Sequence, residues 1–322
     1  MLRATTLSVC AVALALAGCD GEVIEAGGWS IVILPDTQYY ARSYPETFAA
    51  QTAWIRDQAD ALDLQLVLHA GDITDDNSQT QWQVARDAFD SIEGEVPYVL
   101  AIGNHDMGPL GSARTRDTLL HEYFPPSAAM AQRGFGGLFD PARLDNGWHL
   151  FETPDGPWLV LSLEFGPRTE VVAWADEVLR AHPSVPTILL THAYLYSDDT
   201  RYDIASRPDQ EWSPHHYGVR DLPGGVSDGE ALYQALVRRH DQIDFVFCGH
   251  VLNDGLGRLT SPQDGGGVVH ELLADYQVRE RGGEGYLRLL TFHEDRVEVR
   301  TYSPVTGLYL DDLDNRFSLP LP

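Results

Sequence analysis

The sequence predicts an α/β fold, because short apolar runs typical of strands alternate with segments of helical periodicity. Four segments have the apolar spacing of an amphipathic helix: 47–62, 78–92, 169–182 and 228–240. In the last of these, Ser227 or Asp228 is a suitable N-cap. Apolar runs such as "LQLVLHAGD" and "PTILLTH" lie between the helical segments. Strands and helices that alternate in this way are typical of α/β architecture.

Two regions depart from this alternation. Residues 193–227 form a long segment rich in polar and aromatic residues. Segments of this length inside a domain are usually functional lids or disordered, and the aromatic content favours an ordered lid. From Val268 onward, alternating runs such as "GYLRLLTF" and "RVEVRTYSP" predict an antiparallel sheet that closes the domain.

The composition indicates a globular, strongly acidic protein. The 322 residues are 43% hydrophobic, which is enough to bury a substantial core. The net charge of -26 arises from 48 acidic and 22 basic residues. Such a surface repels phosphate backbones, so it disfavours nucleic-acid binding without excluding a nuclease. A small phosphorylated substrate can still bind where bound cations supply positive charge.

The first 18 residues resemble a bacterial lipoprotein signal peptide. Arg3 precedes the apolar stretch 7–17, which is shorter than the roughly 20 residues that span a bilayer. The stretch ends in "LAGC", which resembles the lipoprotein box, so we expect cleavage before Cys19 and lipidation of Cys19. An ordinary signal peptide with an incidental cysteine is the alternative.

This interpretation makes the protein an exported lipoprotein that faces the periplasm or the cell exterior. Its only membrane contact would be the lipid anchor, whose acyl chains contribute roughly 0.8 kcal/mol per buried methylene. Residues 19–28 would form the lipidated cysteine and an acidic tether, and residues 29–322 the folded domain. Cys248 would then have no cysteine partner in the mature chain, which excludes a disulfide framework.

Five apolar runs share one property, because each ends in an Asp, Asn or His. These polar residues are Asp36, Asp72, the block Asn104-His105-Asp106, His192 and His250. Ligands of α/β sheets bind beyond the carboxyl ends of the strands, so we expect these side chains to meet at one edge. Taken singly, each is a turn residue or a core histidine. Converging carboxylates and imidazoles would repel or desolvate one another without a cation, and this ligand mix suits Zn, Mn or Fe.

The order and spacing of these residues resemble the calcineurin-like metallophosphoesterases over Ile31 to Leu252. The most specific motif is "GNHD", supported by "GD" before it and "GH" after it. The resemblance implies a four-layer α-β-β-α sandwich that holds two divalent metal ions. It also implies a metal-dependent phosphoesterase, which hydrolyses phosphodiesters or phosphomonoesters with a metal-activated water.

The resemblance implies a role for each motif residue. Asp72 would bridge the two ions, and Asp36 would bind the first. The second ion would be completed by Asn104, His192 and His250. His105 would stabilise the transition state or protonate the leaving group, and Asp106 would orient His105.

The first metal site departs from the family pattern. The family's Asp-x-His reads Asp-Thr-Gln at 36–38, and its Gly-His-x-His reads "GHVL" at 249–252. Both missing histidines belong to the first site. Gln38 can offer an amide oxygen, and Asn253 or Asp254 could reach in from the following turn. Oxygen ligands would favour a harder cation such as Mn, Mg or Ca in a mixed or weakly occupied site.

The lid segment supplies candidates for substrate contacts. These are His215, His216 and Tyr217, although a loop packed by its own aromatic residues is an equal alternative. The cations of the segment suit bidentate phosphate contacts: Arg201, Arg207 and Arg220. Asp275, Tyr276 and Gln277 follow the run "VVHELLA". They could line the crevice near the altered first site, but a plain strand end is the favoured interpretation.

The main rival to an enzyme is a catalytically silent, metal-containing binding or scaffold lipoprotein. The missing first-site histidines support this alternative. The intact His105 argues against it, because a structural metal site has no use for an unligated imidazole there. A metal-dependent hydrolase acting on another bond would use the same ligands, but the order and spacing favour phosphate esters.

Overall fold

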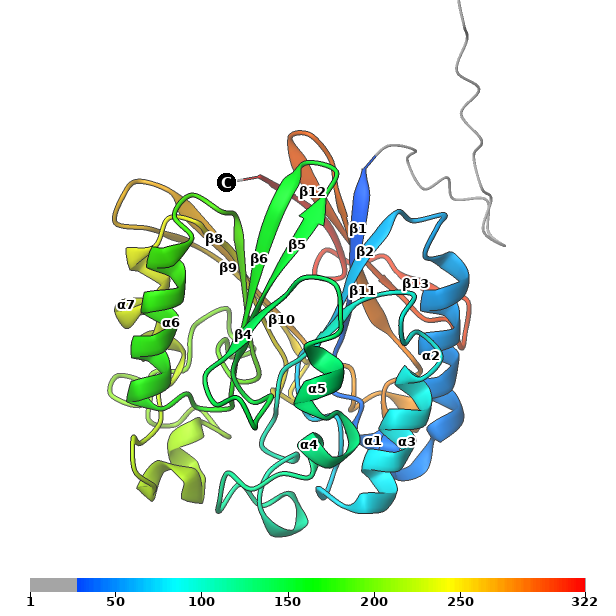
Figure 1. Cartoon of the computed structure of the whole chain (residues 1–322), viewed down its shortest axis with the longest axis horizontal. Coiled ribbons are helices and arrows are strands. Elements are labelled where there is room, and N and C mark those ends of the chain that lie inside the picture. The colour runs from blue at the N-terminus through cyan, green and yellow to red at the C-terminus, as the bar shows by residue number, and fades with distance from the viewer. Residues whose placement is uncertain (1–27, 322) are drawn as a thin grey trace, which may run out of the picture.

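The computed structural model describes residues 28–321, which form two mixed β-sheets lying face to face (Figure 1). The first sheet has the order β13 (Tyr309–Leu310), β12 (Arg296–Tyr302), β11 (Leu287–Phe292), β1 (Trp29–Leu34), β2 (Leu64–His69) and β3 (Tyr98–Leu100). A further strand, β14, pairs with β12 and covers Arg316–Pro320.

The second sheet has seven strands among the described residues. Its order is β4 (Phe135–Leu138), β5 (Gly147–Thr153), β6 (Gly156–Leu163), β7 (Thr187–Thr191), β8 (Ile243–Cys248), β10 (Val268–Ala274) and β9 (Leu256–Pro262).

Helices cover the outer face of each sheet (Figure 1). The first sheet carries α1 (Gln38–Ser43), α2 (Pro45–Gln58) and α3 (Gln79–Phe89), and the second carries α6 (Thr169–Ala181) and α7 (Gly229–Ala235). Two one-turn helices, α4 (Leu120–Tyr123) and α5 (Pro126–Ala129), lie near the lower edge. This arrangement confirms the predicted four-layer α/β sandwich. None of the helices in residues 28–321 has the length and apolar character needed to span a membrane.

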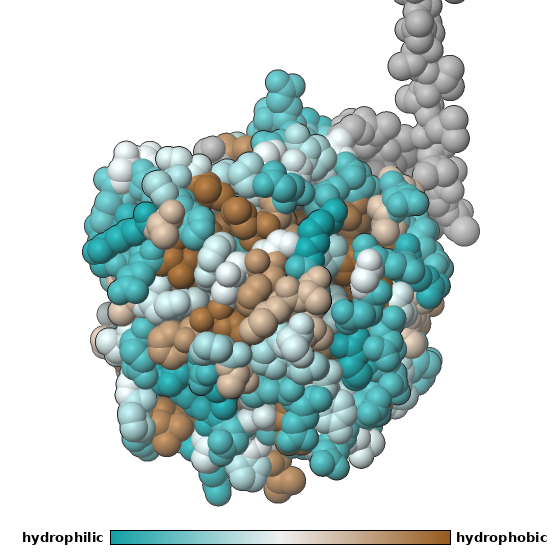
Figure 2. All heavy atoms as spheres, viewed as in Figure 1, coloured by the Kyte–Doolittle hydropathy of each residue, from teal (hydrophilic) through white to brown (hydrophobic). Residues whose placement is uncertain are grey.

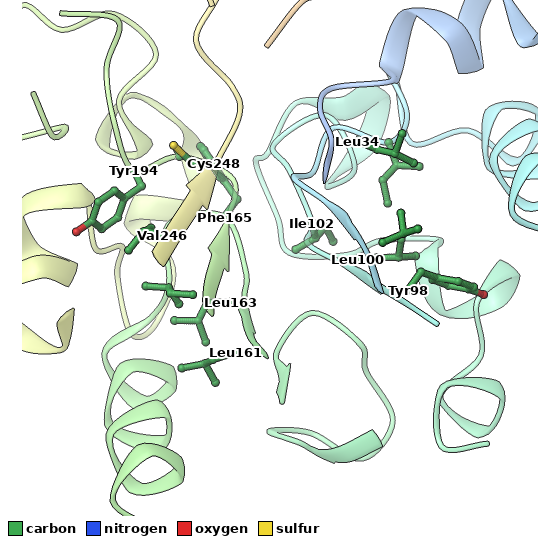
Figure 3. Packing of buried hydrophobic residues seen from close by; sticks show 14 of the residues in the cluster. Leu34, Tyr98, Leu100, Ile102, Leu161, Leu163, Phe165, Tyr194, Val246 and Cys248 are labelled. Carbon is green, nitrogen blue, oxygen red and sulfur yellow. The ribbon is translucent and has the colours of Figure 1, made fainter. Parts of the chain in front are cut away.

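Alternating residues of the central strands serve two different cores. Ile31 and Ile33 of β1 belong to the cluster between the sheets, which also contains Phe245 and Phe247 of β8. On the other side of each sheet, residues such as Leu161 and Leu163 belong to the cluster that the helices cover, as Figure 3 shows. Because both faces of these strands are buried, their sequences read as continuous apolar runs. The visible surface in Figure 2 is mostly hydrophilic, in keeping with the acidic composition.

The strands that carry the polar motifs run parallel. In the first sheet β1, β2 and β3 are parallel, and in the second β6, β7, β8 and β10 are parallel. Their carboxyl ends therefore reach the same edge of the sandwich, which is the lower edge in Figure 1. β11, β12 and β14 are antiparallel, as predicted. β10 is antiparallel to β9, as predicted, but parallel to its other neighbour β8, where the prediction was wrong.

The structure also refines the expected helices and the lid. Asp228 is the N-cap of α7, since its Oδ1 accepts a hydrogen bond from the Ala231 backbone N–H at 2.9 Å. Residues 193–227 cross the lower edge as an irregular segment that contains two short 3-10 turns, Pro214–His216 and Gly218–Asp221. The predicted signal peptide, Cys19 and the tether up to residue 27 lie outside the described residues.

One lid cation has a different task from the one predicted. The guanidinium of Arg201 pairs with Glu271 at 2.8 Å and with Glu230 at 3.0 Å, and it lies 3.4 Å from the ring centroid of Tyr233. Its ion pairs therefore hold the lid against β10 and α7, and its charge is not available to bind a phosphate. Arg207 and Arg220 are exposed, with Asp203 and Asp221 as acidic neighbours respectively.

A buried histidine of β5 makes the stability of the fold depend on pH. Burial lowers the pKa of His149 from 6.5 to about 4, so below pH 6.5 the unfolded chain binds a proton that the folded chain excludes. The free energy of unfolding should fall by about 1.4 kcal/mol per pH unit from this residue as the pH drops toward 4. Urea unfolding in chelator measures this effect. Between pH 7.5 and 5, the free energy of unfolding of His149→Leu should fall by about 2 kcal/mol less than that of wild type. The exposed His216→Ala should follow the wild-type pH curve, and parallel curves for His149→Leu would contradict the prediction.

Candidate metal centre

The structure brings three of the predicted ligands together at the carboxyl edge. Asp72, His192 and His250 each place a ligand atom within 4.8 Å of the other two, and all three are buried. Asp72 follows β2 of the first sheet, whereas His192 and His250 follow β7 and β8 of the second sheet. Asp36 joins them after β1, with its Oδ1 3.8 Å from His192 Nε2.

Motif glycines make room for these carboxylates. A Cβ on Gly103 would collide with the side chain of Asp72, and a Cβ on Gly249 would collide with that of Asp36. The glycines in the "GNHD" and "GH" motifs are therefore needed because a carboxylate packs directly against each backbone. This explains why the motif pairs a glycine with a polar residue at two strand ends.

The tautomers of the two histidines are fixed by main-chain oxygens. His192 Nδ1 lies 2.8 Å from the carbonyl of Ala70, and His250 Nε2 lies 2.7 Å from the carbonyl of Trp212. A carbonyl can only accept, so these two nitrogens carry the protons. His192 Nε2 and His250 Nδ1, which lie 3.1 Å apart, are the ring nitrogens left to face a cation. Main-chain acceptors on the far side of each ring orient the imidazoles, as expected of a metal site.

Charges in the cluster are strongly coupled. Burial alone would lower the pKa of His192, but the carboxylates of Asp72 and Asp36 raise it to about 10. Burial and the neighbouring His192 lower the pKa of His250 to about 3, which leaves this imidazole neutral and available as a ligand. Burial, followed by the charge of Asp275, raises the pKa of Asp36 well above its usual range.

Two further predicted ligands have unpaired oxygens. Asn104 Oδ1 and Gln38 Oε1 are both buried without a hydrogen-bond partner. A buried acceptor with no donor costs about 1–3 kcal/mol unless a cation or water satisfies it. Asn104 follows β3 and Gln38 opens α1, two residues after Asp36. The donor set of carboxylates, amides and imidazoles therefore fits divalent metal ions.

His105 is placed as an unligated imidazole beside this cluster. Its backbone N–H donates to Asp72 Oδ1 at 2.8 Å, and its Nδ1 lies 2.7 Å from the carbonyl of Asp75. Because the carbonyl accepts, Nδ1 carries the proton and Nε2 is the nitrogen left for proton exchange with a ligand. The carbonyl of Asp75 therefore fixes the ring.

The structure does not match the predicted role of Asp106 as the group that orients His105. Its carboxylate accepts hydrogen bonds from the backbone N–H groups of Gly103, Ile73 and Thr74 at 3.0, 3.1 and 2.8 Å, and from the Thr74 hydroxyl at 2.9 Å. Asp106 thus joins the loop after β2 to the loop after β3. It fixes the backbone from which Asp72 and Asn104 project.

A second buried polar chain joins the loop after β1 to the loop after β2. His69 Nδ1 accepts from the Gly71 N–H at 3.2 Å, so its Nε2 carries the proton and donates to Thr37 Oγ1 at 2.9 Å. Thr37 Oγ1 donates in turn to the carbonyl of Ile73 at 3.2 Å. His69 is therefore a support behind the cluster rather than a ligand.

The lid reaches the cluster through aromatic residues. The ring of Tyr217 lies 6.0 Å from that of His250 and 5.1 Å from that of Phe165. Burial and the charge of Asp72 raise the pKa of Tyr217, so its phenol is a neutral hydrogen-bond donor. His215 Nε2 instead lies 3.3 Å from Asp228 Oδ2, and His216 is exposed. Of the three predicted lid residues, Tyr217 is the one that contacts a ligand residue.

For Asp275 and Gln277, the sequence favoured a plain strand end over lining of the crevice. Both residues are buried, and the charge of Asp275 is, after burial, the largest cause of the raised pKa of Asp36. The signal in the sequence is that Asp275 directly follows a strand-like run.

Removing the Asp106 carboxylate tests its role as a clamp. Asp106→Ala leaves three backbone N–H groups and a hydroxyl without their acceptor, so the free energy of unfolding should fall by about 3 kcal/mol or more. Urea unfolding in chelator measures this loss. His105→Ala is the control and should change stability little. Wild-type stability in Asp106→Ala would show that the carboxylate is not a clamp.

Comparisons with known proteins agree with the geometry. A family model described as calcineurin-like phosphoesterase matches residues 30–254. The uncharacterized protein YvnB of Bacillus subtilis (strain 168) is 33% identical over 281 residues, which covers 86% of this chain and 20% of YvnB. The chain thus spans about a fifth of that relative's length.

A solved structure has a similar fold. The purple acid phosphatase PPD1 from yellow lupin (Lupinus luteus) seeds matches with a TM-score of 0.52 at 17% sequence identity. The match covers 92% of this chain and 54% of that chain. At this level of identity, the likeness concerns the fold alone.

Proposed function

Since the chain belongs to the calcineurin-like phosphoesterase family, we propose that it hydrolyses phosphate esters at the carboxyl edge of its two sheets, using two divalent metal ions. The observation that carries the proposal is the buried cluster of Asp72, His192 and His250 with the free imidazole of His105 beside it. Such a cluster without His105 would serve a structural ion equally well.

The residues divide into two ligand groups around a shared carboxylate. Asp72 would contact both ions, and the second ion would be held by Asn104, His192 and His250. Asp36 and Gln38 would serve the first ion. Divalent cations held in this way supply Lewis-acid charge that activates water and offsets the charge developing on the phosphate.

His105 would move the proton. Its ring is fixed through Nδ1 by the Asp75 carbonyl, so a proton bound at Nε2 can be given to the departing oxygen of the ester. The same carbonyl stabilises the imidazolium form that precedes the transfer. This assignment gives the imidazole a use that the silent-scaffold alternative does not provide.

The substrate class follows from charge and from the lid. A net charge of -26 disfavours long polyanions, so we assign a phosphorylated small molecule rather than nucleic acid. The half-buried ring of Tyr217, backed by the buried Phe165, lies beside His250, and the organic group of an ester can pack against it. We also propose that the chain is an exported lipoprotein anchored through Cys19.

Hydrolysis by the purified chain tests the proposal. After removal of metals and resupply with Mn, Zn, Fe, Mg or Ca singly, we expect turnover of bis(p-nitrophenyl) phosphate or p-nitrophenyl phosphate. His105→Ala should lower kcat about 10²–10⁴-fold while ion binding is retained. No turnover by folded wild type with any of these ions would favour the silent scaffold.

The lid tyrosine can be tested separately from the metal ligands. Tyr217→Phe removes one neutral donor, and the loss of a hydrogen bond to a charged phosphate should lower kcat/KM about tenfold or more. The exposed His216→Ala is a matched control from the same segment and should leave kcat/KM unchanged. Equal kinetics for wild type and Tyr217→Phe would remove Tyr217 from the substrate site.

A further inference from the structure

Asp275 directly follows β10 and lies beside the turn after β8 that carries His250. β10 pairs in parallel with β8, with Leu273 opposite Cys248, so the residues that follow the two strands emerge side by side. Asp36 packs against the same turn from the other strand layer, because its two oxygens accept from the His250 N–H at 3.1 and 3.3 Å. Asp36 and Asp275 therefore border one turn, at the place where this chain lacks its first-site histidines.

Three buried carboxylates share this region. Asp36, Asp72 and Asp275 are each at most 2% exposed. His192 Nε2 lies 3.8 Å from Asp36 Oδ1 and 3.1 Å from Asp72 Oδ2. One imidazole cannot compensate three buried carboxylates, so the region favours a further cation.

Gln277, which is hydrogen-bonded to Asp275, has a side-chain amide oxygen without a partner. Gln277 donates to both oxygens of Asp275, from its backbone N–H at 2.8 Å and from its side-chain Nε2 at 2.9 Å. These bonds fix the carboxylate and leave Gln277 Oε1 buried without a partner. The oxygen cannot accept from Asp275 when the latter is ionised, so it needs a donor or a cation nearby.

A second buried amide oxygen without a partner lies at the start of α1, a helix that neighbours the 275–277 turn. The hydroxyl of Tyr40 and the carbonyl of Tyr276 both lie against Gly283, so α1 and the 275–277 turn are neighbours. Gln38, two positions before Tyr40 at the start of α1, has its Oε1 buried and unpaired. Two acceptors without donors thus accompany the carboxylates.

The two residues first considered for this place are turned elsewhere. Asn253 Nδ2 donates to Tyr196 Oη at 3.1 Å and to Ser197 Oγ at 2.8 Å, and its side chain is exposed. Asp254 Oδ1 accepts from the Leu256 N–H at 3.2 Å and is also exposed. Neither points to the cluster, which leaves Asp275 as the acidic residue that can complete the site.

We propose that Asp275 is a ligand of the first metal ion and replaces the imidazoles that this chain lacks, with Gln277 as its positioning residue. The first site then offers oxygens from Asp36, Asp72, Asp275 and Gln38, and it selects a hard cation such as Mn²⁺ over Zn²⁺. The existence of a first ion rests on the proposed function. The test below measures ion binding and not hydrolysis.

Calorimetric titration of the metal-stripped full chain with MnCl₂ tests the ligand assignment. Wild type should bind two Mn²⁺ ions. Asp275→Asn should weaken one of the two sites by about tenfold or more and leave the other unchanged. The matched control is Asp254→Asn, which alters an exposed carboxylate in the neighbouring turn and should keep two wild-type sites. Two wild-type sites in Asp275→Asn would overturn the assignment.

Thermal unfolding separates a ligand from a merely structural residue. In chelator, Asp275→Asn should melt no lower than wild type, because it removes one of three mutually repelling carboxylates. Added Mn²⁺ should then raise its Tm by less than it raises that of wild type. If Asp275 only anchors Gln277, the variant should instead melt lower than wild type by the same amount with and without Mn²⁺.

A third variant checks the selectivity. Asp275→His restores an imidazole to the first site and should shift the preference of that site from Mn²⁺ toward Zn²⁺. An unchanged preference for Mn²⁺ would count against Asp275 as a ligand.

The outcomes also distinguish this assignment from the proposed function. If the ions bind as expected but wild type hydrolyses no phosphate ester, the ligand assignment stands and the phosphoesterase proposal fails. If wild type hydrolyses phosphate esters and Asp275→Asn keeps both ion-binding sites, the ligand assignment fails and the phosphoesterase proposal stands.

Discussion

The structure depends on a concentration of buried charge at one edge of the two sheets. Carboxylates held in a region without water repel one another strongly, and they are tolerated where cations and fixed donors compensate them. The backbone around the site holds these side chains together despite that repulsion. Asp72 and His250 adopt left-handed backbone conformations with φ of 48° and 84°, which are uncommon for residues other than glycine. Backbone strain of this kind persists where the surrounding structure fixes the residue, and such residues cluster at functional sites.

The sequence was informative wherever a side chain follows a buried parallel strand. Asp72, His192 and His250 could be placed at one edge because the carboxyl ends of parallel strands meet there. Asp275 obeys the same rule, but a plain strand end was the favoured interpretation of it. Alternation of apolar and polar residues identifies a strand without giving its direction, and β10 takes its direction from the hairpin with β9. Strand direction therefore limited what could be predicted about the site.

Contacts to the main chain could not be predicted from residue types. Asp106 follows His105 in the sequence, yet its carboxylate binds the backbone of two loops while the imidazole binds the carbonyl of Asp75. Consecutive residues of a turn point in different directions, so adjacency gives no partner. Arg201 presents the same difficulty, because Glu271, its ion-pair partner, is 70 residues away in the sequence. The predicted four-layer fold needed only periodicity and family resemblance, whereas these roles needed coordinates.

The hydrogen bond between His250 and Trp212 links the lid to the metal centre through a main-chain atom. A carbonyl oxygen is present whatever the side chain, so residue 212 can change in sequence without loss of the contact, provided that the backbone keeps its left-handed turn at φ of 60°. The lid can therefore vary in composition, and with it the shape presented to a substrate, while the imidazole keeps its tautomer. Specificity and ion binding can thus evolve independently in this fold, although one segment serves both.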